Sequence, residues 1–426
     1  MIEIDGINQK LKNYTKKAPK VKTVIHWWDL YKGHYVKLNP DLQKQIFQEA
    51  IEKAGGRFTW LGEKLKISRR TIAECWRLKR NPQISTLIKV ANFIKFSLGE
   101  IEKHIIQFPK SSLNFRPKLP FKLHSPEGAE IRAAFLSDGH VEDNPIKCPR
   151  YFAVEPELHN RLIGFSKRVF GNFNAQTKFN SKSYVTQFPA PIGDALKLAG
   201  VPGKDKRLIK IFVPKDILLG SQKIQASYLR RVFDDEGDVC FDKYGKRAVR
   251  ITRSTDITNK NLVFSSLKSE RWTFVNNSNI PINMLLLGEQ LLLYKLGIDA
   301  RIYSEGVYRS RRKRITAKWR IQIGQQDSVR KFSKIINFNL KVKRRKLSEV
   351  LKSYKLHKFS HNEGKKFVAK ILNQIYKKKG YFFYGDLSKK FLKIGKSYDL
   401  SGYYLRILTR KKLIKKLKRG QYVFTN

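Results

Sequence analysis

The chain has 426 residues, of which 88 are Lys or Arg and 35 are Asp or Glu, so its formal net charge is +53. A hydrophobic fraction of 41% and an aromatic fraction of 12% are enough for packed cores, which excludes charge-driven disorder for most of the chain. A charge this positive repels itself unless a polyanion lies against it, and nucleic acid is the default partner. The length predicts two to four domains.

Export and membrane insertion are not indicated. The most apolar segment, residues 282–294, is shorter than the roughly 20 apolar residues that span a bilayer. The first residues contain no apolar run typical of a signal peptide. Cys75, Cys148 and Cys240 are far apart and odd in number, which fits neither a disulfide framework nor a CxxC metal site. We therefore expect a cytoplasmic, nucleoid-associated protein without a membrane partner.

Residues 1–40 show little periodicity and are treated as an N-terminal extension. A helical pattern begins at Asp41 and ends at Gly55-Gly56. Two shorter helical patterns follow, and Ser68 is the predicted N-cap of a helix over 69–79. Another helix is predicted from residue 84, so residues 41–108 form a helical domain.

A short helix, a tight turn and a second helix with basic side chains are typical of a helix-turn-helix, whose second helix enters the major groove. Residues 67–94 resemble the phage-repressor-like helix-turn-helix family. The resemblance implies that the second helix contacts DNA through Arg69, Arg70, Thr71 and Arg77. The alternative is a plain helical bundle with a solvated basic face.

Two polar segments divide the rest of the chain. Residues 109–128 contain four prolines and are predicted to be a linker, and residues 352–365 are predicted to be a second one. Between them, residues 129–351 alternate helical and strand patterns. Residues 366–426 resemble a winged helix in pattern, with Arg406 on a recognition helix predicted over 400–417. A winged helix that binds protein is the alternative.

One motif occurs twice. Residues 131–139 read IRAAFLSDG and residues 229–237 read LRRVFDDEG, so each is an apolar helical stretch that ends in an acid and a glycine. Each glycine can adopt the left-handed conformation that ends a helix. Asp138 and Glu236 would face the negative ends of their helix dipoles, and side-by-side packing would add mutual repulsion. A bound divalent cation removes both penalties, which predicts a Mg²⁺ site.

These segments resemble the two signature helices of the LAGLIDADG (DOD-type) homing endonucleases. GVPGKDKRLIKIFVPKDIL, over 200–218, is similar to the run before the second signature helix in archaeal-type members. LLLYKLGIDARIY, WRIQIGQQDSVRKFSKIINF and KVKRRKLSEVL then follow the second copy in the family's order. The resemblance covers roughly residues 130–351.

The resemblance implies an α+β fold with two pseudosymmetric αββαββ halves, about 129–220 and 221–351, in one monomeric chain. The all-α helix-turn-helix and winged-helix domains flank this core. It further implies catalytic, metal-binding roles for Asp138 and Glu236 with Mg²⁺ or Mn²⁺. The basic residues near the scissile phosphate carry over to Lys206, with Lys204 as an alternative, and to Lys343.

The second copy departs from the family where the helices touch. Small residues are expected there, and the first copy has Ala133 and Ser137, whereas the second has Arg231 and Asp235. Arg231 and Asp235 are four residues apart, so they are expected to pair. The alternative to an enzyme is a scaffold of the same fold that binds DNA without cutting it.

A basic hairpin is predicted near the end of the core. Residues 315–323 alternate apolar and polar side chains, and seven of the twelve residues over 309–320 are basic. A two-stranded ribbon fits the major groove, where Arg can read guanine. A solvated basic face is the alternative, and the pattern does not separate base contacts from phosphate contacts. The candidate DNA contacts of the strands are Arg250, Arg253, Arg312, Lys318 and Arg320.

Together these features predict a site-specific endonuclease of the homing type that hydrolyses both strands of DNA with a divalent metal. A domesticated DNA-binding transcription regulator that retains the fold without cleavage is the alternative. RNA binding is a third hypothesis.

Overall fold

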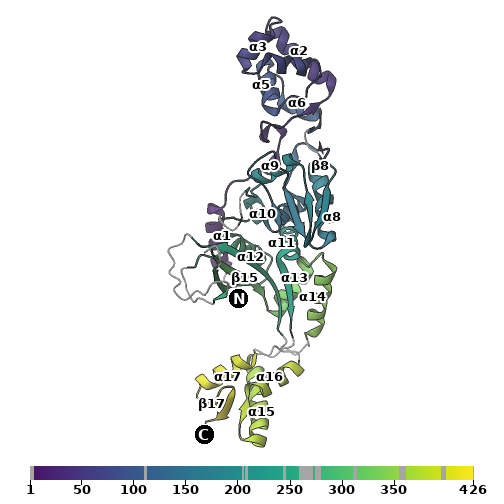
Figure 1. Cartoon of the computed structure of the whole chain (residues 1–426). Coiled ribbons are helices and arrows are strands. Elements are labelled where there is room, and N and C mark those ends of the chain that lie inside the picture. Colours follow the sequence, from purple (N-terminus) through teal and green to yellow (C-terminus); the bar gives the residue numbers. More distant parts are fainter. Residues whose placement is uncertain are drawn as a thin grey trace. The chain divides into compact units, whose positions relative to one another are not determined.

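The computed structural model of the chain (Figure 1) describes residues 4–109, 113–203, 206, 210–242, 246–258, 272–273, 280–309, 314–354, 361–394 and 400–425. It divides into two compact units. The first comprises Met1–Glu236, Thr252–Leu296 and Ile302–Arg320, and the second comprises Gly237–Ile251, Gly297–Arg301 and Ile321–Asn426. Helices and antiparallel strands occur in both, in agreement with the predicted α+β class. Within the described residues, no helix combines the length and the apolarity needed to cross a bilayer.

The N-terminal part of the first unit is mainly helical. The helices predicted from Asp41 onward are present, and the Ser68 hydroxyl accepts a hydrogen bond from the Thr71 amide at 3.1 Å, which confirms the N-cap. The capped helix is shorter than predicted because Leu78 has a positive φ of 58°. The elements are α1 (Ile4–Lys17), β1 (Val24–Ile25), the 3₁₀ helix η1 (Trp27–Asp29), β2 (Lys37–Leu38), α2 (Pro40–Lys53), α3 (Phe58–Leu65), α4 (Arg69–Trp76), α5 (Ile84–Ile94), α6 (Leu98–Lys103) and β3 (Ile105–Gln107).

Residues 4–40 are folded, although their sequence shows little periodicity. Trp27 is fully buried, and its indole donates a hydrogen bond to the Leu98 carbonyl at 3.2 Å. β2 pairs with β3, which joins this segment to the helices. At the other end, α1 packs against α12 (Met284–Lys295). The Tyr14 hydroxyl accepts from the Val213 amide and donates to the Met284 carbonyl, both at 2.9 Å.

The prediction that residues 109–128 form a linker is wrong for the part that the structure describes, because apolar side chains of this segment are buried. Phe115 and Phe121 are both 0% exposed. The segment instead contains two short strands, β4 (Arg116–Pro117) and β5 (Phe121–Lys122), and the start of a helix. Pro126 occupies the first turn of that helix, where its missing amide costs nothing, and Ser125 caps it.

The paired motif lies on two helices, α7 and α11, that pack along each other. Between them in sequence is an antiparallel sheet with the strand order β6-β7-β10-β9. The elements are α7 (Pro126–Leu136), β6 (Gly139–His140), β7 (Arg150–Ala153), α8 (Pro156–Phe170), β8 (Gly171–Asn172), β9 (Gln176–Asn180), β10 (Ser183–Gln187), α9 (Ala190–Leu198), α10 (Lys215–Leu219) and α11 (Gln222–Glu236).

A second sheet follows α11, with the strand order β11-β12-β15-β14-β13. The described elements of this region, besides α12, are β11 (Gly237–Phe241), β12 (Arg247–Asp256), β13 (Trp272–Thr273), β14 (Arg301–Arg309), β15 (Ile315–Ile323), α13 (Gln326–Ile335) and α14 (Lys341–Ser353). Without the short strands β8 and β13, the order helix, two strands, helix, two strands, helix occurs twice. The two sheets also share one strand order, first-second-fourth-third.

The C-terminal residues form helices beside a small sheet (Figure 1, yellow). Their core includes Leu372, Phe382 and Phe391, all fully buried. The helix predicted over 400–417 ends at Arg410, and its last residues form a strand instead. The elements are α15 (His361–Lys379), β16 (Phe382–Phe383), α16 (Tyr384–Lys393), α17 (Leu400–Arg410), β17 (Ile414–Lys418) and β18 (Gln421–Phe424), with the strand order β16-β18-β17.

Candidate functional site

The two motif helices are mostly buried, which requires their buried charged residues to be paired. Every residue of α7 from Gly128 to Leu136 is buried. Arg132 is fully buried and donates to both carboxylate oxygens of Asp216 at 2.7 Å. A helix that is buried all round lies at the centre of a fold. The ends of α7 and α11 are therefore held in fixed positions.

The bulky residues of the second motif copy are accommodated by ion pairing. Arg231 Nε lies 3.1 Å from Asp235 Oδ2, which confirms the predicted pair, and both side chains are 0% exposed. The Tyr151 hydroxyl donates to Asp235 at 2.8 Å, and Arg231 also donates to the Leu158 carbonyl at 3.2 Å. Arg231 therefore reaches toward α8, and α11 still packs along α7.

The glycines that follow the acids act differently from the prediction. Neither Gly139 nor Gly237 has a positive φ, and each begins a strand. A Cβ atom at Gly139 would lie 2.6 Å from the Phe135 Cα atom. Glycine is required there because the chain turns back closely over the end of α7, so the expectation of left-handed helix caps was wrong.

Asp138 and Glu236 influence each other electrostatically at the ends of the two helices. Burial raises the pKa of Asp138 to about 6, and the Glu236 carboxylate is the second cause. Two carboxylates in one partly buried place disfavour simultaneous ionisation. The structure thus brings together the two acids that the sequence singled out.

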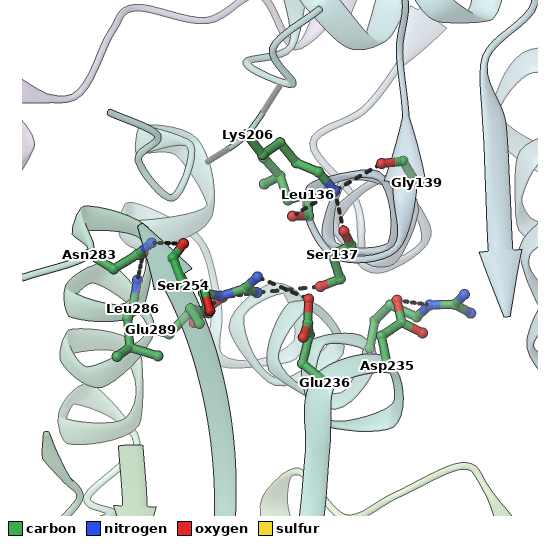
Figure 2. Close-up of polar contacts among 12 residues, drawn as sticks. Leu136, Ser137, Gly139, Lys206, Asp235, Glu236, Ser254, Asn283, Leu286 and Glu289 are labelled. Atoms are coloured by element: carbon green, nitrogen blue, oxygen red, sulfur yellow. Dashed lines mark hydrogen bonds and ion pairs between the residues drawn. The ribbon is translucent and has the colours of Figure 1, made fainter. Parts of the chain in front are cut away.

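Lys206 joins them from the segment before α10 (Figure 2). Its ammonium donates to the carbonyl oxygens of Leu136 at 3.3 Å and Gly139 at 2.8 Å, and also to that of Ser137. The positive charge therefore lies at the negative end of the α7 dipole. Burial lowers the pKa of Lys206 to about 8, with Arg253 as the next cause.

Glu236 has a basic neighbour that requires a correction. Arg253 was predicted to contact DNA, but it is only 8% exposed and its Nη1 atom lies 3.3 Å from Glu236 Oε1. Its main partner is Glu289 on α12, at 2.6–3.1 Å. The sequence reasoning missed Glu289. The available signal was an acid inside the apolar run 282–294, which is typical of a buried ion pair.

The remaining predicted residues lie apart from these acids or are not placed relative to them. Lys343 is half-buried on α14, in the second unit. Lys204 and Arg312 lie outside the described residues. On α4, Arg69, Arg70 and Arg77 are exposed and Thr71 is half-exposed, and Arg406 is exposed on α17.

The described strand residues other than Arg253 that were predicted to contact DNA have acidic neighbours. Arg250 pairs with Asp238 at 2.5 Å. Lys318 and Arg320 both pair with Glu305, at 3.1 and 2.8 Å. The alternation of β15 is as predicted, because Trp319, Ile321 and Ile323 are buried and the side chains between them are half-exposed. Such partly exposed pairs contribute little to stability and can exchange partners.

The residues around the helix ends fit a small divalent cation. Arg253 and Glu289 form a neutral pair. The two negative charges of Asp138 and Glu236 and the one positive charge of Lys206 then give a net charge of −1 at this place. No group of three or more His, Cys, Asp and Glu side chains with metal-binding geometry occurs in the described part of the chain. Mg²⁺ is commonly held by one or two carboxylates together with substrate phosphates, so two acids are sufficient.

Comparisons with known proteins give matches only among solved structures. No family model and no curated protein matches the chain. The chain is similar to structures of the homing endonuclease I-DmoI. A mesophilic-variant structure and a complex with DNA and Ca each show 14% identity and a TM-score of 0.32, covering 54% of this chain and 100% of that chain. A complex with DNA and Mn shows 13% identity and a TM-score of 0.31, covering 50% of this chain and 97% of that chain.

Proposed function

We propose that the chain is a site-specific endonuclease of the homing type that hydrolyses phosphodiester bonds in double-stranded DNA with a divalent metal. One observation carries the proposal. Glu236 is the last residue of α11 and Asp138 lies two residues beyond the end of α7, and the charge of Glu236 contributes to raising the pKa of Asp138. In a chain of net charge +53, a pair of acids that repel each other calls for a cation.

The chain's own residues have distinct roles in this proposal. Asp138 and Glu236 would hold Mg²⁺ or Mn²⁺, which would supply charge neutralisation at the scissile phosphate and activation of water. Lys206, whose pKa is about 8, keeps its proton at neutral pH and stabilises negative charge at the same helix end. Lys343 remains a proposed second cation of this kind.

The repeated order of elements supports two related halves within one monomer. Each half would contribute one carboxylate and one sheet, so that one chain cuts both strands. The half-exposed residues Arg250, Lys318 and Arg320 would exchange their acidic partners for DNA. The N-terminal helix-turn-helix and the C-terminal winged-helix-like domain would extend the bound length of DNA.

The decisive experiment is cleavage of a plasmid library of target sites by the full chain with Mg²⁺. We expect the wild type to linearise a subset of plasmids, and Asp138→Asn and Glu236→Gln to lose at least a hundredfold in rate. Glu142→Gln is the matched control, because this acid follows the first motif but pairs with Arg150 at 2.8 Å. Specific binding without any nicking would overturn the proposal, and full activity of both acid variants would overturn the assigned site.

DNA binding is tested by measuring the affinity of the chain for DNA as a function of salt concentration. Because lysines and arginines that contact phosphates release counterions, the affinity for the cleaved site should fall steeply between 50 and 200 mM salt, about a thousandfold for six contacts. A flat response would exclude DNA as the partner. A structured RNA competitor of equal length should displace the DNA only weakly, and effective displacement would favour RNA as the ligand.

A DNA-binding regulator without cleavage is the second candidate. The observation that favours it is the contact of Arg253 with Glu236, because an internal arginine already engages one of the two acids. This hypothesis expects a specific complex whose affinity does not change with Mg²⁺ and whose DNA stays intact. The same plasmid experiment separates it from the enzyme.

A further inference from the structure

Glu289 is a fully buried acid that has no role in the proposed reaction. It lies on α12 in a stretch that is apolar apart from Gln290, and its side chain is 0% exposed. Burial raises its pKa, while the adjacent Arg253 guanidinium counteracts this. A buried carboxylate of this kind is costly to the fold unless its partner fully compensates it, so its position calls for an explanation.

The guanidinium of Arg253 contacts two acids through different nitrogen atoms. Its Nε and Nη2 atoms donate to Glu289 at 2.6–3.1 Å, which is a two-pronged, charge-assisted contact. Its Nη1 atom touches Glu236 at the longer distance of 3.3 Å, and Nη2 reaches the Ser137 hydroxyl at 3.3 Å. Glu289 therefore holds the arginine firmly, and Glu236 holds it loosely.

Helix α12 is anchored so that Glu289 faces this arginine. Asn283 caps α12 by accepting from the Leu286 amide at 3.0 Å. The same side chain donates to the Thr255 hydroxyl at 3.0 Å, two residues after Arg253 on β12. Figure 2 shows its contacts with the Leu286 amide and the Ser254 carbonyl. The start of the helix and the strand that carries the arginine are thus joined directly.

The first half has no such arginine. In β6 and β7, Gly139 is opposite Tyr151, and in β11 and β12, Gly237 is opposite Ile251. Tyr151 and Ile251 thus occupy equivalent positions on β7 and β12. Two residues after each of them lie Ala153 on β7 and Arg253 on β12, so Ala153 is the equivalent of Arg253. Of the two acids, only Glu236 therefore has an arginine at this position of the second strand in its half.

We propose that Glu289 is a positioning residue that holds Arg253 by one edge and thereby leaves Glu236 available to bind a divalent cation. Without the negative charge of Glu289, the buried guanidinium would have Glu236 as its remaining anionic partner and would compete with the cation for it. The inference rests on the proposed metal site. It makes the two acids unequal, because only Glu236 is subject to this competition.

The test is the affinity of the full chain for Mn²⁺, measured by isothermal titration calorimetry without DNA. Glu236→Gln must weaken Mn²⁺ binding. Glu289→Gln, which keeps the shape of the side chain, is expected to weaken it about tenfold. The double variant Arg253→Met with Glu289→Met removes both charges and is expected to bind at least as tightly as the wild type.

A matched control separates positioning from stability. Asp216→Asn breaks the largely buried pair with Arg132, which lies within α7 rather than at its end. It is expected to lower the free energy of unfolding while leaving Mn²⁺ affinity within a factor of two. A parallel loss of Mn²⁺ affinity in this control would overturn the inference, as would unchanged affinity in Glu289→Gln. If Glu289→Gln fails to fold, the double variant decides, and a loss as large as in Glu236→Gln would overturn the inference.

The outcomes also separate this inference from the proposed function. A wild type that binds Mn²⁺ through Glu236 but never cuts DNA would remove the endonuclease proposal, and the Mn²⁺ series would still decide the role of Glu289. If the protein cuts DNA, Glu289→Gln is expected to slow cleavage of one DNA strand more than cleavage of the other, so nicked circular plasmid accumulates. Equal slowing of both strands with unchanged Mn²⁺ affinity would mark a general structural role and overturn the inference.

Discussion

The two motif helices have similar sequences but different surroundings. At the end of α7, the Lys206 ammonium caps backbone carbonyls, and its charge counteracts the rise in the pKa of Asp138. At the end of α11, Glu236 touches Arg253, which Glu289 holds. The helix packing therefore fixes where the acids lie, whereas residues from other elements set the charge around each one. Four changes test this distinction, from the largest expected effect to the smallest.

Arg231→Met should reveal that α11 depends on a buried ion pair between two of its own residues, whereas the buried Arg132 of α7 pairs with Asp216 on α10. The substitution leaves the Asp235 carboxylate buried with Tyr151 as its remaining contact, so we expect a loss of about 3–5 kcal/mol in the free energy of unfolding. Urea denaturation measures it. Adding Asp235→Leu should recover most of the loss, and a loss below about 1 kcal/mol for the single variant would contradict the pairing.

Gly139→Ala tests the close approach at the end of α7. The new Cβ atom would lie 2.6 Å from the Phe135 Cα atom, which is backbone and can give way little. We expect a loss of about 1–3 kcal/mol. Gly164→Ala in α8 is the control, because nothing lies within 4 Å of its added Cβ atom, and it should stabilise by about 0.5–1 kcal/mol. Equal effects at both glycines would remove the argument for a tight turn.

Asp138→Asn should stabilise the metal-free protein while abolishing cleavage. The pKa of this carboxyl is raised to about 6, so its ionised form destabilises the fold above that pH. The penalty disappears as the pH falls from about 6 toward the ordinary value near 4. We expect a gain of about 1–2 kcal/mol at pH 8 that shrinks at pH 4.5, seen in thermal unfolding curves.

The second acid provides the comparison for this pH series. Glu236→Gln removes a charged partner of Arg253 and is expected to give no such gain at pH 8. If both variants stabilised the protein equally, the two helix ends would be equivalent and the contrast drawn above would fail.

Ser125→Ala compares the starts of the two helices. The Ser125 hydroxyl accepts from the Gly128 amide at 3.0 Å, whereas Ser221 accepts from the Ile224 amide only at 3.5 Å. Loss of an N-cap costs about 1 kcal/mol, so Ser125→Ala should approach that value and Ser221→Ala should cost a few tenths. Chemical denaturation of the two variants measures the difference, and a reversed order would contradict the geometry.

Local patterns in the sequence predicted the parts of the fold that depend on neighbouring residues. The helices after Asp41, the Ser68 cap and the alternation of β15 follow from side-chain spacing and cap chemistry. The motif acids could be located because each comes at or just after the end of an apolar helical stretch. The pairing of Arg231 with Asp235 was also predictable, because the two residues are four apart on one helix.

The missed features depend on contacts between distant residues. Arg253 and Glu289 are 36 residues apart, and no spacing rule joins a strand residue to a helix residue at that separation. In the expected linker, prolines were given more weight than Phe115 and Phe121, whose burial depends on partners elsewhere in the chain. Lys206 could be named only through resemblance, and its contacts with the end of α7 required the structure.

The contact of Tyr14 with the core limits how the protein can be divided into modules. Its ring lies so close to Gly288 that a Cβ atom there would be 2.3 Å from the hydroxyl, one residue before Glu289. A fragment that begins at residue 129 would lose this ring and leave the Val213 amide and the Met284 carbonyl without their partner. Transplantation of the central region into another protein therefore has to carry α1 with it, or replace that helix with a designed cover over α12.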